Sequence, residues 1–376
     1  MSNERLLGTV ISQSVTEDQF DNALTIILNE KIIERFDEKE LLPIIYGNAL
    51  RYPKSVAGLR LSKPDTVDSL NRRITSLYDV ASDIITKLDS AGIQCLLLKN
   101  SAIGKLSKLS NFENPMGDID FLVMAHDLEA VLQIMLDAGH KIIGDKSALL
   151  SLENRDEFEI IVEKSGFRHR FEFQTRPVSG RWISKKQEPS ASTIWSGTRI
   201  IDDTNFHTLA PEILLLTVCL HTAKHSFVRS PGFRLHTDVD RLVNYDQVDW
   251  IKFIALVEKH RVKVPVYFSL YFAQEFLRTN IPADVIYTLR PSFLRRKFIL
   301  HSLKNVGFLN PNENKWSRLG YVIFTLSLYD NFLSVVENLF FSKKMIEERF
   351  GVKAARNPIL FNIRRIINLI AVRENH

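Results

Sequence analysis

The sequence predicts an α+β protein: a small mixed β-sheet flanked by N-terminal helices and by a large C-terminal helical region. Residues 64–90 and most of the chain after Ala210 repeat apolar side chains at three- and four-residue intervals, the helical period. Between them, the runs IQCLLLK (93–99) and DIDFLV (118–123) have the length and composition of strands. The chain has 376 residues, 45% of them hydrophobic and 25% charged, which predicts two or three domains with sizeable cores.

The first elements are helices that lead into the sheet. Residues 17–50 show helical spacing, and the helix of residues 64–90 is expected to end at Gly92, a typical stop signal. IQCLLLK is then a short apolar run suited to a buried strand. The polar segment 100–117 is expected to be a loop that connects this strand to DIDFLV.

The following segments predict a helix, a hairpin and a further pair of strands. Residues 125–140 form an amphipathic pattern that should stop at Gly139. Residues 157–175 alternate on both sides of Ser165-Gly166, the pattern of a β-hairpin. Residues 192–209 can hold one more strand pair before the chain becomes helical.

Composition indicates a protein of a reducing compartment without a membrane span. Cys95 and Cys219 lie in apolar runs and are expected to be buried free thiols. The first twenty residues lack the order of a signal peptide, so a cytoplasmic location is expected. The apolar stretch 319–341 contains Asp330 and Glu337, which are costly in hydrocarbon, so we expect one or two buried helices there.

Charge is distributed unevenly along the chain. The net charge is +5, yet residues 290–376 contain 15 Lys/Arg and 6 Asp/Glu, a balance of +9, and residues 1–289 have a balance of −4. A basic C-terminal part can attract phosphates, nucleic acid or an anionic membrane, or it can be a solvated helical face. Without arginine-glycine repeats or interleaved aromatic side chains, nucleic acid is disfavoured as a partner.

Two carboxylates one residue apart mark the first candidate site. In an alternating strand, Asp118 and Asp120 point to the same face, and this arrangement can hold Mg²⁺ together with substrate phosphates. Such sites usually recruit a third carboxylate from a neighbouring strand. Glu172 in the second half of the hairpin is the leading candidate, with Glu157 and Glu159 as competitors.

A second group of polar residues lies in HTAKHSF. On a helix, His221 and His225 are one turn apart with Lys224 beside them. This is the spacing of a zinc pair, but no third ligand is evident in the sequence. The alternative is packed histidines satisfied by neighbouring carboxylates such as Asp238 or Asp240.

Several motifs in a fixed order resemble the nucleotidyltransferases of the DNA polymerase beta-like superfamily, in particular a bacterial branch with the pattern LLKG, GDIDLLV, DLHW and HAAKH. The resemblance covers residues 91–278, and the chain's end, NPILFNIRRIINLI, is loosely similar to the family's tail. The corresponding segments here are LLLKNSAI, NPMGDIDFLV, FEFQTRP, LLLTVCLHTAKHSF and RLHTDVDRLV.

The resemblance implies a site that binds a nucleoside triphosphate and Mg²⁺ or Mn²⁺ on three carboxylates. A lysine at the end of the first strand and the cations of the HTAKHSF helix would then stand near the phosphates. The implied catalytic and metal-binding residues are Asp118, Asp120 and Glu172, and the implied nucleotide-binding residues are Lys99, Asn100, Ser101, Lys224 and His225.

Three positions differ from the family's pattern. Asn100-Ser101 replaces a glycine pair, so Asn100 is expected either to adopt a left-handed conformation or to change the contact with phosphate. Asn114 stands where this branch often has arginine, and Gln174 replaces the histidine of DLHW. The three carboxylates are retained.

The predicted function is a Mg²⁺-dependent nucleotidyltransferase. It would transfer a nucleoside monophosphate from an NTP, with ATP as the expected donor, to a hydroxyl or phosphate of an unidentified small molecule, peptide or protein. The alternative is a catalytically inactive nucleotide-binding or regulatory protein with the same fold. A third alternative is a membrane-surface or nucleic-acid module built on residues 290–376.

The resemblance and the element order together predict four regions. Residues 1–90 form an N-terminal helical region, and residues 91–205 form the nucleotidyltransferase core. Residues 206–289 form a helical domain that closes the cleft, and residues 290–376 form a basic C-terminal helical region.

Overall fold

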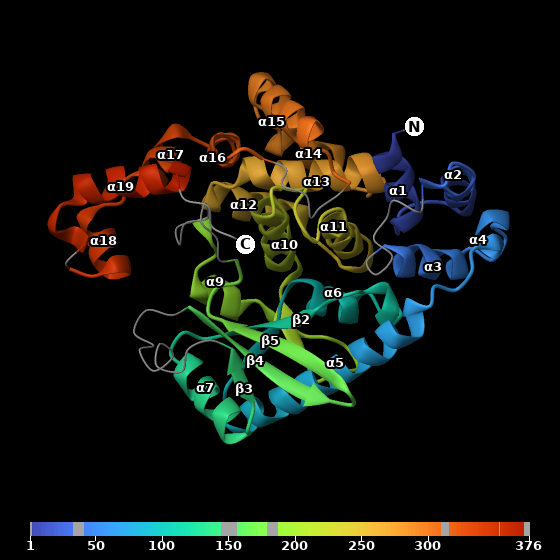
Figure 1. Ribbon diagram of the computed structural model, residues 1–376, viewed down its shortest axis with the longest axis horizontal. Helices are drawn as coiled ribbons and strands as arrows, with labels where there is room; N and C mark the ends of the chain where they lie inside the picture. The colour runs from blue at the N-terminus through green and yellow to red at the C-terminus, as the bar shows by residue number, and fades with distance from the viewer. Residues whose placement is uncertain are drawn as a thin grey trace.

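A computed structural model describes residues 2–32, 41–143, 156–178, 187–309, 316–352 and 354–371. Helices surround a mixed sheet on both faces, and the last helices form an extension at one side of the molecule (Figure 1). The architecture confirms the predicted α+β class, with a small sheet between N-terminal helices and a large C-terminal helical region.

The N-terminal region is helical, as predicted. Helix α5 (Thr66–Ser90) buries Leu77 and Ile84 and ends at Gly92, whose φ of +73° is the conformation that glycine supplies at a helix end. Helix α2 begins with a capping box between Thr16 and Gln19. The helices before α5 are α1 (Asn3–Ile11), α2 (Glu17–Asn29), α3 (Leu42–Arg51) and α4 (Val56–Arg60).

The described residues contain a seven-stranded mixed sheet in the order β3-β4-β5-β2-β1-β7-β6. Strand β2 lies at its centre, parallel to β5 and antiparallel to β1, while β1 and β7 are parallel and the other neighbours are antiparallel. The strands are β1 (Cys95–Leu97), β2 (Asp118–Val123), β3 (Lys141–Ile143), β4 (Glu157–Lys164), β5 (Phe167–Gln174), β6 (Thr198–Ile200) and β7 (His207–Leu209).

One face of the sheet is apolar and packs on helices α5 and α7 (Leu128–Asp137), which lie below it in Figure 1. Ile119 and Phe121 of β2 and Phe171 and Phe173 of β5 are fully buried there. The rings of Phe121 and Phe173 are stacked, with centroids 5.1 Å apart. Because a one-residue slip would turn these side chains to the other face, their burial fixes the register of the strands that carry the acidic residues.

The prediction of a loop over residues 100–117 is wrong. Residues Lys99–Leu106 form helix α6, and Asn111–Glu113 form the 3-10 helix η2. Ala102 and Ile103 are buried, so tertiary packing stabilises a helix too short to show a periodic pattern. Gly104 suggests a loop in the sequence, but it permits close packing, because a Cβ there would lie 2.0 Å from Asn114 Nδ2.

The hairpin and the later strand pair are confirmed. Strands β4 and β5 are antiparallel and turn at Ser165 and Gly166, both with positive φ. Helix α7 is followed by Gly139, whose φ is +79°, at the predicted stop. Strands β6 and β7 pair as expected, although helix α9 (Ala191–Ser196) precedes them.

The C-terminal helices cover the other side of the sheet, with α10–α13 above it in Figure 1. Cys219 in α10 and Cys95 in β1 are buried free thiols, as predicted. The helices are α10 (Pro211–Lys224), α11 (Arg234–Tyr245), α12 (Trp250–His260), α13 (Lys263–Leu277), α14 (Ala283–Leu289) and α15 (Phe293–Val306).

The last elements form a C-terminal arm, defined here as residues 318–371. It comprises α16 (Arg318–Ser327), α17 (Phe332–Leu339), α18 (Lys343–Phe350), η5 (Ala354–Arg356) and α19 (Pro358–Ala371). Residues 319–341 form two helices, as expected, but these are only partly buried: Phe324 is fully buried, whereas Leu319 is 54% and Phe332 79% exposed. In the part of the chain that the structure describes, no helix is both long and apolar enough to cross a bilayer.

Candidate active site

The face of the sheet opposite α5 and α7 carries the predicted carboxylates. In β2, Asp118 and Asp120 alternate with the buried Ile119 and Phe121, so both aspartates point to the polar face. Strand β5 lies parallel to β2 in a register that pairs Asp120 with Glu172. Two strands far apart in the sequence therefore place three carboxylates on one face.

Strand order distinguishes Glu172 from its two competitors. Glu159 lies opposite Glu172 in β4, and Glu157 lies opposite Gln174, so both are one strand farther from β2. The Glu159 carboxylate is 3.5 Å from Nε of Arg170, the residue that pairs in register with Asp118. Glu172 is therefore the hairpin carboxylate in the strand adjacent to the aspartates.

Lys99 supplies a positive charge to this group. Its Nζ lies 2.6 Å from Asp120 Oδ1, and both side chains are only 14% exposed. Gln174 Nε2 lies 3.5 Å from the same oxygen. Burial by itself lowers the pKa of Lys99, but Asp120 and Glu172 outweigh it, so the net pKa is raised. Lys99 is therefore a firmly charged internal counter-ion of the acidic group.

The carboxylates remain under-neutralised despite Lys99. Burial, followed by repulsion from Asp120, raises the pKa of Glu172 to about 7. Burial and the charge of Asp120 also raise the pKa of Asp118. Within the described residues, no three His, Cys, Asp or Glu side chains are close enough together to hold a metal ion. The carboxylates thus share a face and lack positive charge without forming a closed coordination shell.

The end of α10 faces the same group of charges. Burial, followed by repulsion from Lys99, lowers the pKa of Lys224 by more than Glu172 raises it, so the net pKa is lowered. Burial, then repulsion by Lys99, holds the pKa of His221 well below its ordinary value. Burial and Lys224 lower the pKa of His225 to about 4. Both imidazoles are therefore neutral at pH 7 and lie beside the phosphate-binding candidates.

The two histidines contact each other, and the expected partner Asp240 is engaged elsewhere. The rings of His221 and His225 are 4.7 Å apart in an edge-to-face arrangement. Asp240 accepts hydrogen bonds from Gln13 N at 2.7 Å and Thr279 Oγ1 at 2.7 Å, so it ties α11 to the N-terminal helices. Among the described residues, the buried Nδ1 of His221 has no hydrogen-bond partner.

The turn after β1 differs from the expectation for Asn100. The left-handed residue is Lys99, with φ +49°, and Asn100 lies inside α6. Ser101 is buried, and its Oγ donates to Leu98 O at 2.6 Å, so this hydroxyl closes the first turn of the helix. Asn100 Nδ2 donates to Pro115 O at 3.1 Å, while its buried Oδ1 has no partner in the described residues.

Sequence reasoning missed Arg241, which is fully buried in α11. Its Nη1 donates to Asn114 Oδ1 at 2.7 Å, and Asn114 Nδ2 in turn donates to Asn100 O at 3.0 Å. Asn114 therefore links α11 to α6 and does not face a ligand. The signal available in the sequence was an arginine directly after two aspartates, Asp238 and Asp240, both of which are buried.

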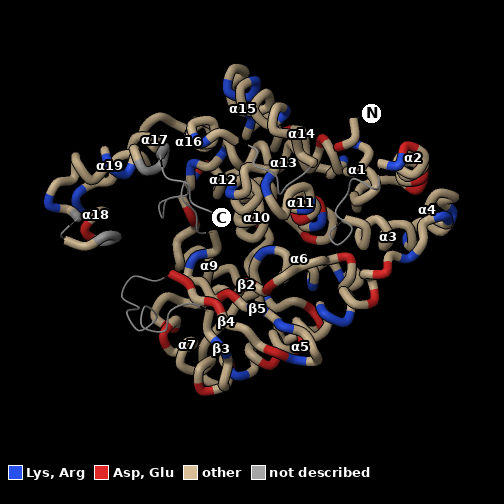
Figure 2. Tube along the Cα trace, in the orientation of Figure 1, with Lys and Arg blue, Asp and Glu red and all other residues tan. Residues whose placement is uncertain are grey.

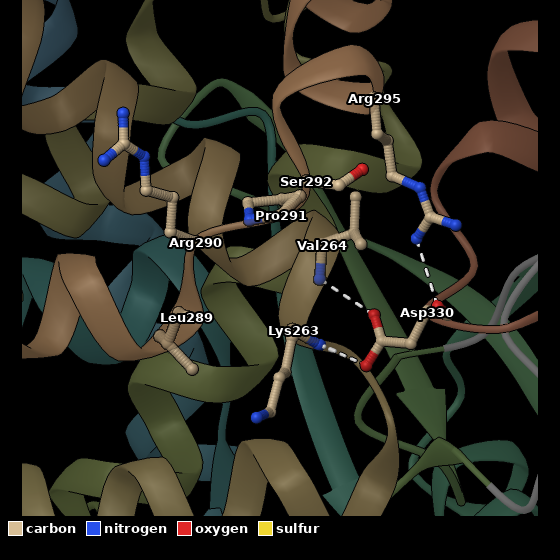
Figure 3. A pocket seen from close by; sticks show the side chains of 8 residues that line it. All are labelled: Lys263, Val264, Leu289, Arg290, Pro291, Ser292, Arg295 and Asp330. Atoms are coloured by element: carbon tan, nitrogen blue, oxygen red, sulfur yellow. Dashed lines mark hydrogen bonds between the residues drawn. The ribbon is translucent and has the colours of Figure 1, made fainter.

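A pocket of about 270 Å³ lies away from the sheet, among α13, α14 and α15 (Figure 3). Asp330 closes one side of it and accepts hydrogen bonds from the backbone N–H groups of Lys263 and Val264 at 2.8 and 2.9 Å. Arg295 Nη1 donates to the backbone carbonyls of Tyr329 and Asp330. The amino end of α13 is thus already capped by the chain's own carboxylate, and the pocket marks the joint between the arm and the helical body.

Comparison with known proteins identifies the family. Residues 29–278 match the family model described as uncharacterised nucleotidyltransferase, which is more than half of the chain. The chain belongs to this nucleotidyltransferase family. Its matched region contains the sheet, the acidic face and helices α10–α13. Neither the curated proteins nor the solved structures gave a match.

Proposed function

We propose that this nucleotidyltransferase is a Mg²⁺-dependent enzyme of the DNA polymerase beta-like kind that transfers a nucleoside monophosphate from an NTP to an acceptor. The observation that carries the proposal is the in-register pairing of Asp120 with Glu172, beside Asp118 and Lys99, on one polar face. A triphosphate bound with Mg²⁺ requires carboxylates that can bind the ion and a lysine that can bind the phosphates.

The donor set fits a hard divalent cation. Asp118, Asp120 and Glu172 offer only carboxylate oxygens, and the raised pKa values of Asp118 and Glu172 show that burial and mutual repulsion disfavour their charged forms. Because no three such side chains in the described residues are close enough to hold an ion by themselves, phosphate oxygens of the substrate would complete the ligands of Mg²⁺ or Mn²⁺ on Asp118, Asp120 and Glu172. When bound, the ion would neutralise negative charge on the phosphates and on the departing pyrophosphate.

The chain's own residues would bind the triphosphate and accept a proton. Lys99 and Lys224 lie in the same electrostatic neighbourhood and would hold the phosphates. The buried, unpartnered Asn100 Oδ1 and His221 Nδ1 are polar atoms beside them that a ligand can satisfy. Glu172 is the carboxylate proposed to take the proton of the acceptor hydroxyl.

The proposed step is an in-line displacement. The acceptor oxygen forms a bond to the α-phosphorus as the bond from that phosphorus to the bridging oxygen of the β-phosphate breaks. Pyrophosphate leaves with the bonding electron pair, and the hydroxyl proton passes to Glu172. ATP is the proposed donor, and the acceptor is a hydroxyl, or alternatively a phosphate, of a small molecule, peptide or protein.

Nucleotide binding and transfer test the proposal directly. The purified chain is titrated with ATP, GTP, CTP and UTP in Mg²⁺ or Mn²⁺, and labelled NTPs are incubated with a panel of acceptors. We expect metal-dependent binding that is lost in Asp118→Ala/Asp120→Ala and kept in the matched control Asp203→Ala, a carboxylate on the exposed surface paired with Lys108. Absence of nucleotide binding with either metal would overturn the proposal.

A catalytically inactive regulatory protein is the second candidate. The engaged side chains after β1 favour it, because Ser101 bonds to Leu98 O and Lys99 is paired with Asp120. Metal-dependent nucleotide binding without transfer to any acceptor, together with a nucleotide that is recovered unchanged, would select this candidate over the enzyme.

A further inference from the structure

Helix α19 of the C-terminal arm turns polar side chains inward. Asn362 is buried, and its amide exchanges two hydrogen bonds with the backbone of Phe341, at 2.8 and 2.9 Å. Arg365 Nη1 donates to the carbonyls of Asn338 and Leu339, both at 3.0 Å, and its guanidinium lies 3.7 Å from the centroid of the Phe341 ring. These polar contacts attach α19 to α17 and to the segment before α18, beside the partly buried Phe361, which packs on the cluster of Phe341, Ile346 and Ala355.

The outward side of α19 is apolar. Ile359, Ile363 and Ile367 are spaced four residues apart, so they form one stripe along the helix, and they are 74%, 48% and 55% exposed. Leu360 beside them is 42% exposed. A surface helix of a globular protein normally shows the reverse, with its apolar stripe toward the core. The orientation of α19 therefore points to an apolar environment outside the protein.

The rest of the arm also exposes apolar side chains, although Phe324 of α16 is buried in the main core. Among the described residues, the arm's own hydrophobic cluster has three buried members, Phe341, Ile346 and Ala355. The arm nevertheless carries nearly half of the large exposed hydrophobic side chains in the described chain. Outside α19, they are Leu319, Ile323, Phe332, Leu333, Phe340 and Val352. An exposed apolar surface of this extent marks an interaction site.

The positive charge of the arm indicates which partner binds this surface. Residues 318–371 contain eight Lys/Arg and four Asp/Glu, and Figure 2 shows Lys and Arg along α18 and α19. Arg364 is exposed between the isoleucines of α19, and Lys343, Lys344 and Arg356 are exposed nearby. A second copy of this basic arm would oppose like charges, whereas anionic lipid headgroups would complement them.

We propose that the C-terminal arm docks the protein on an anionic phospholipid bilayer. Helix α19 has 14 residues and is about 21 Å long, shorter than the roughly 30 Å hydrocarbon core. It therefore lies in the plane of the interface, with its isoleucines in the acyl region and Arg364 at the headgroups. This docking is independent of the proposed catalytic activity, because no carboxylate of the sheet takes part in it.

Vesicle flotation of the full chain tests the proposal. We expect the protein to float with phosphatidylcholine vesicles that contain about 30 mol% phosphatidylglycerol and to dissociate from them at high salt. It should not bind vesicles of pure phosphatidylcholine. Ile359→Ser/Ile363→Ser/Ile367→Ser should weaken binding at least about tenfold. Its matched control is Ile251→Ser, which removes a side chain 84% exposed on α12.

A charge-reversal pair separates electrostatic attraction from apolar burial. Lys343→Glu/Arg364→Glu should weaken binding to anionic vesicles several-fold, whereas Lys87→Glu, an exposed cation on α5, should not. All these positions are exposed, so circular dichroism and melting temperature should stay unchanged. Equal binding to neutral and anionic vesicles would overturn the proposal. So would unchanged binding by the triple variant, or light scattering that shows a dimer through α19 without vesicle binding.

Discussion

The polar face of the sheet and the C-terminal arm both carry groups that a globular protein ordinarily avoids, but of opposite kinds. The sheet encloses charge: Asp118, Asp120 and Glu172 are partly buried around Lys99. The arm exposes apolar surface and places polar side chains, such as Asn362, inside. The difference indicates what each region would bind. The polar face of the sheet requires more positive charge, and the arm requires an apolar environment around its exposed side chains.

The two regions also differ in how firmly they are built. The sheet and helices α10–α13 share one continuous core in which even an arginine, Arg241, is fully buried. The arm has a small cluster of its own and is joined to the body through Asp330, Arg295 and the buried Phe324, which belongs to the main core. The same kind of substitution should therefore lower the free energy of unfolding more in the body than in the arm.

The largest expected contrast is between two arginines that donate to backbone carbonyls. Arg241→Met should lower the free energy of unfolding by about 3 kcal/mol, because it leaves Asn114 Oδ1 and Glu113 O unsatisfied in the interior. Arg365→Met should cost less than about 1 kcal/mol, since its acceptors lie at a partly exposed surface. Urea unfolding followed by circular dichroism measures both, and equal losses would contradict the contrast.

The next effect is the pH dependence contributed by Glu172. Its pKa rises on folding from 4.5 to about 7, so the folded state binds more protons within this window. The stability from this group is present below pH 4.5 and is lost as the pH rises to about 7. At pH 8 the free energy of unfolding of Glu172→Gln should therefore be about 2 kcal/mol higher than that of the wild type. Near pH 4.5 the two values should differ little.

Addition of Mg²⁺ should sharpen that result. If Glu172 is a metal ligand, Mg²⁺ will stabilise the wild type at pH 8 and leave Glu172→Gln nearly unchanged. Urea unfolding at pH 4.5, 6, 7 and 8 with and without Mg²⁺ measures both effects. A difference between the two proteins that does not vary with pH would contradict the assignment of the raised pKa to Glu172.

A smaller effect distinguishes the joint of the arm from an ordinary helix cap. Asp330→Ala removes the acceptor for two N–H groups of α13, and Asp249→Ala does the same for α12, where Asp249 accepts from Ile251 N and Lys252 N. Each should cost about 1 kcal/mol. Only Asp330→Ala should also speed trypsin cleavage within the arm, and equal cleavage of the two variants would argue against this joint.

The smallest effect concerns the internal counter-ion. Lys99→Met should strengthen binding of Mg²⁺ alone by about threefold, because the ammonium that competes with the ion for Asp120 is lost. It should weaken binding of the Mg²⁺–ATP complex, since a phosphate contact is removed. Lys108→Met is the matched control, as it breaks an exposed pair with Asp203. Calorimetric titration measures both, and unchanged affinities would contradict the role of Lys99.

The sequence predicted those parts of the fold that have a strong local signal. The alternation in DIDFLV and in the hairpin identified the apolar face of the sheet, and Gly92 and Gly139 marked helix ends because their positive φ is a local requirement. Helix α6 was missed, since eight residues packed on their neighbours show no repeated period.

The candidate site followed the same division. Asp118 and Asp120 could be paired from spacing alone, because side chains two residues apart in a strand share a face. The family resemblance favoured Glu172 over Glu157 and Glu159, and the strand order, with β5 between β2 and β4, places Glu172 in the strand next to the aspartates. Arg241 and the left-handed Lys99 could not be foreseen, since the contacts of Arg241 come from residues more than a hundred positions away.

The sequence by itself determined the α+β class, the acidic pair of β2 and the basic, apolar character of the chain's last part. Those properties depend on residues close together in the chain. Only the tertiary structure decided that Asn114 is a buried link between helices, that Lys99 neutralises Asp120, and that α19 turns its isoleucines outward. Periodicity reveals that a helix has an apolar face, but the neighbours that pack on it decide which way that face points.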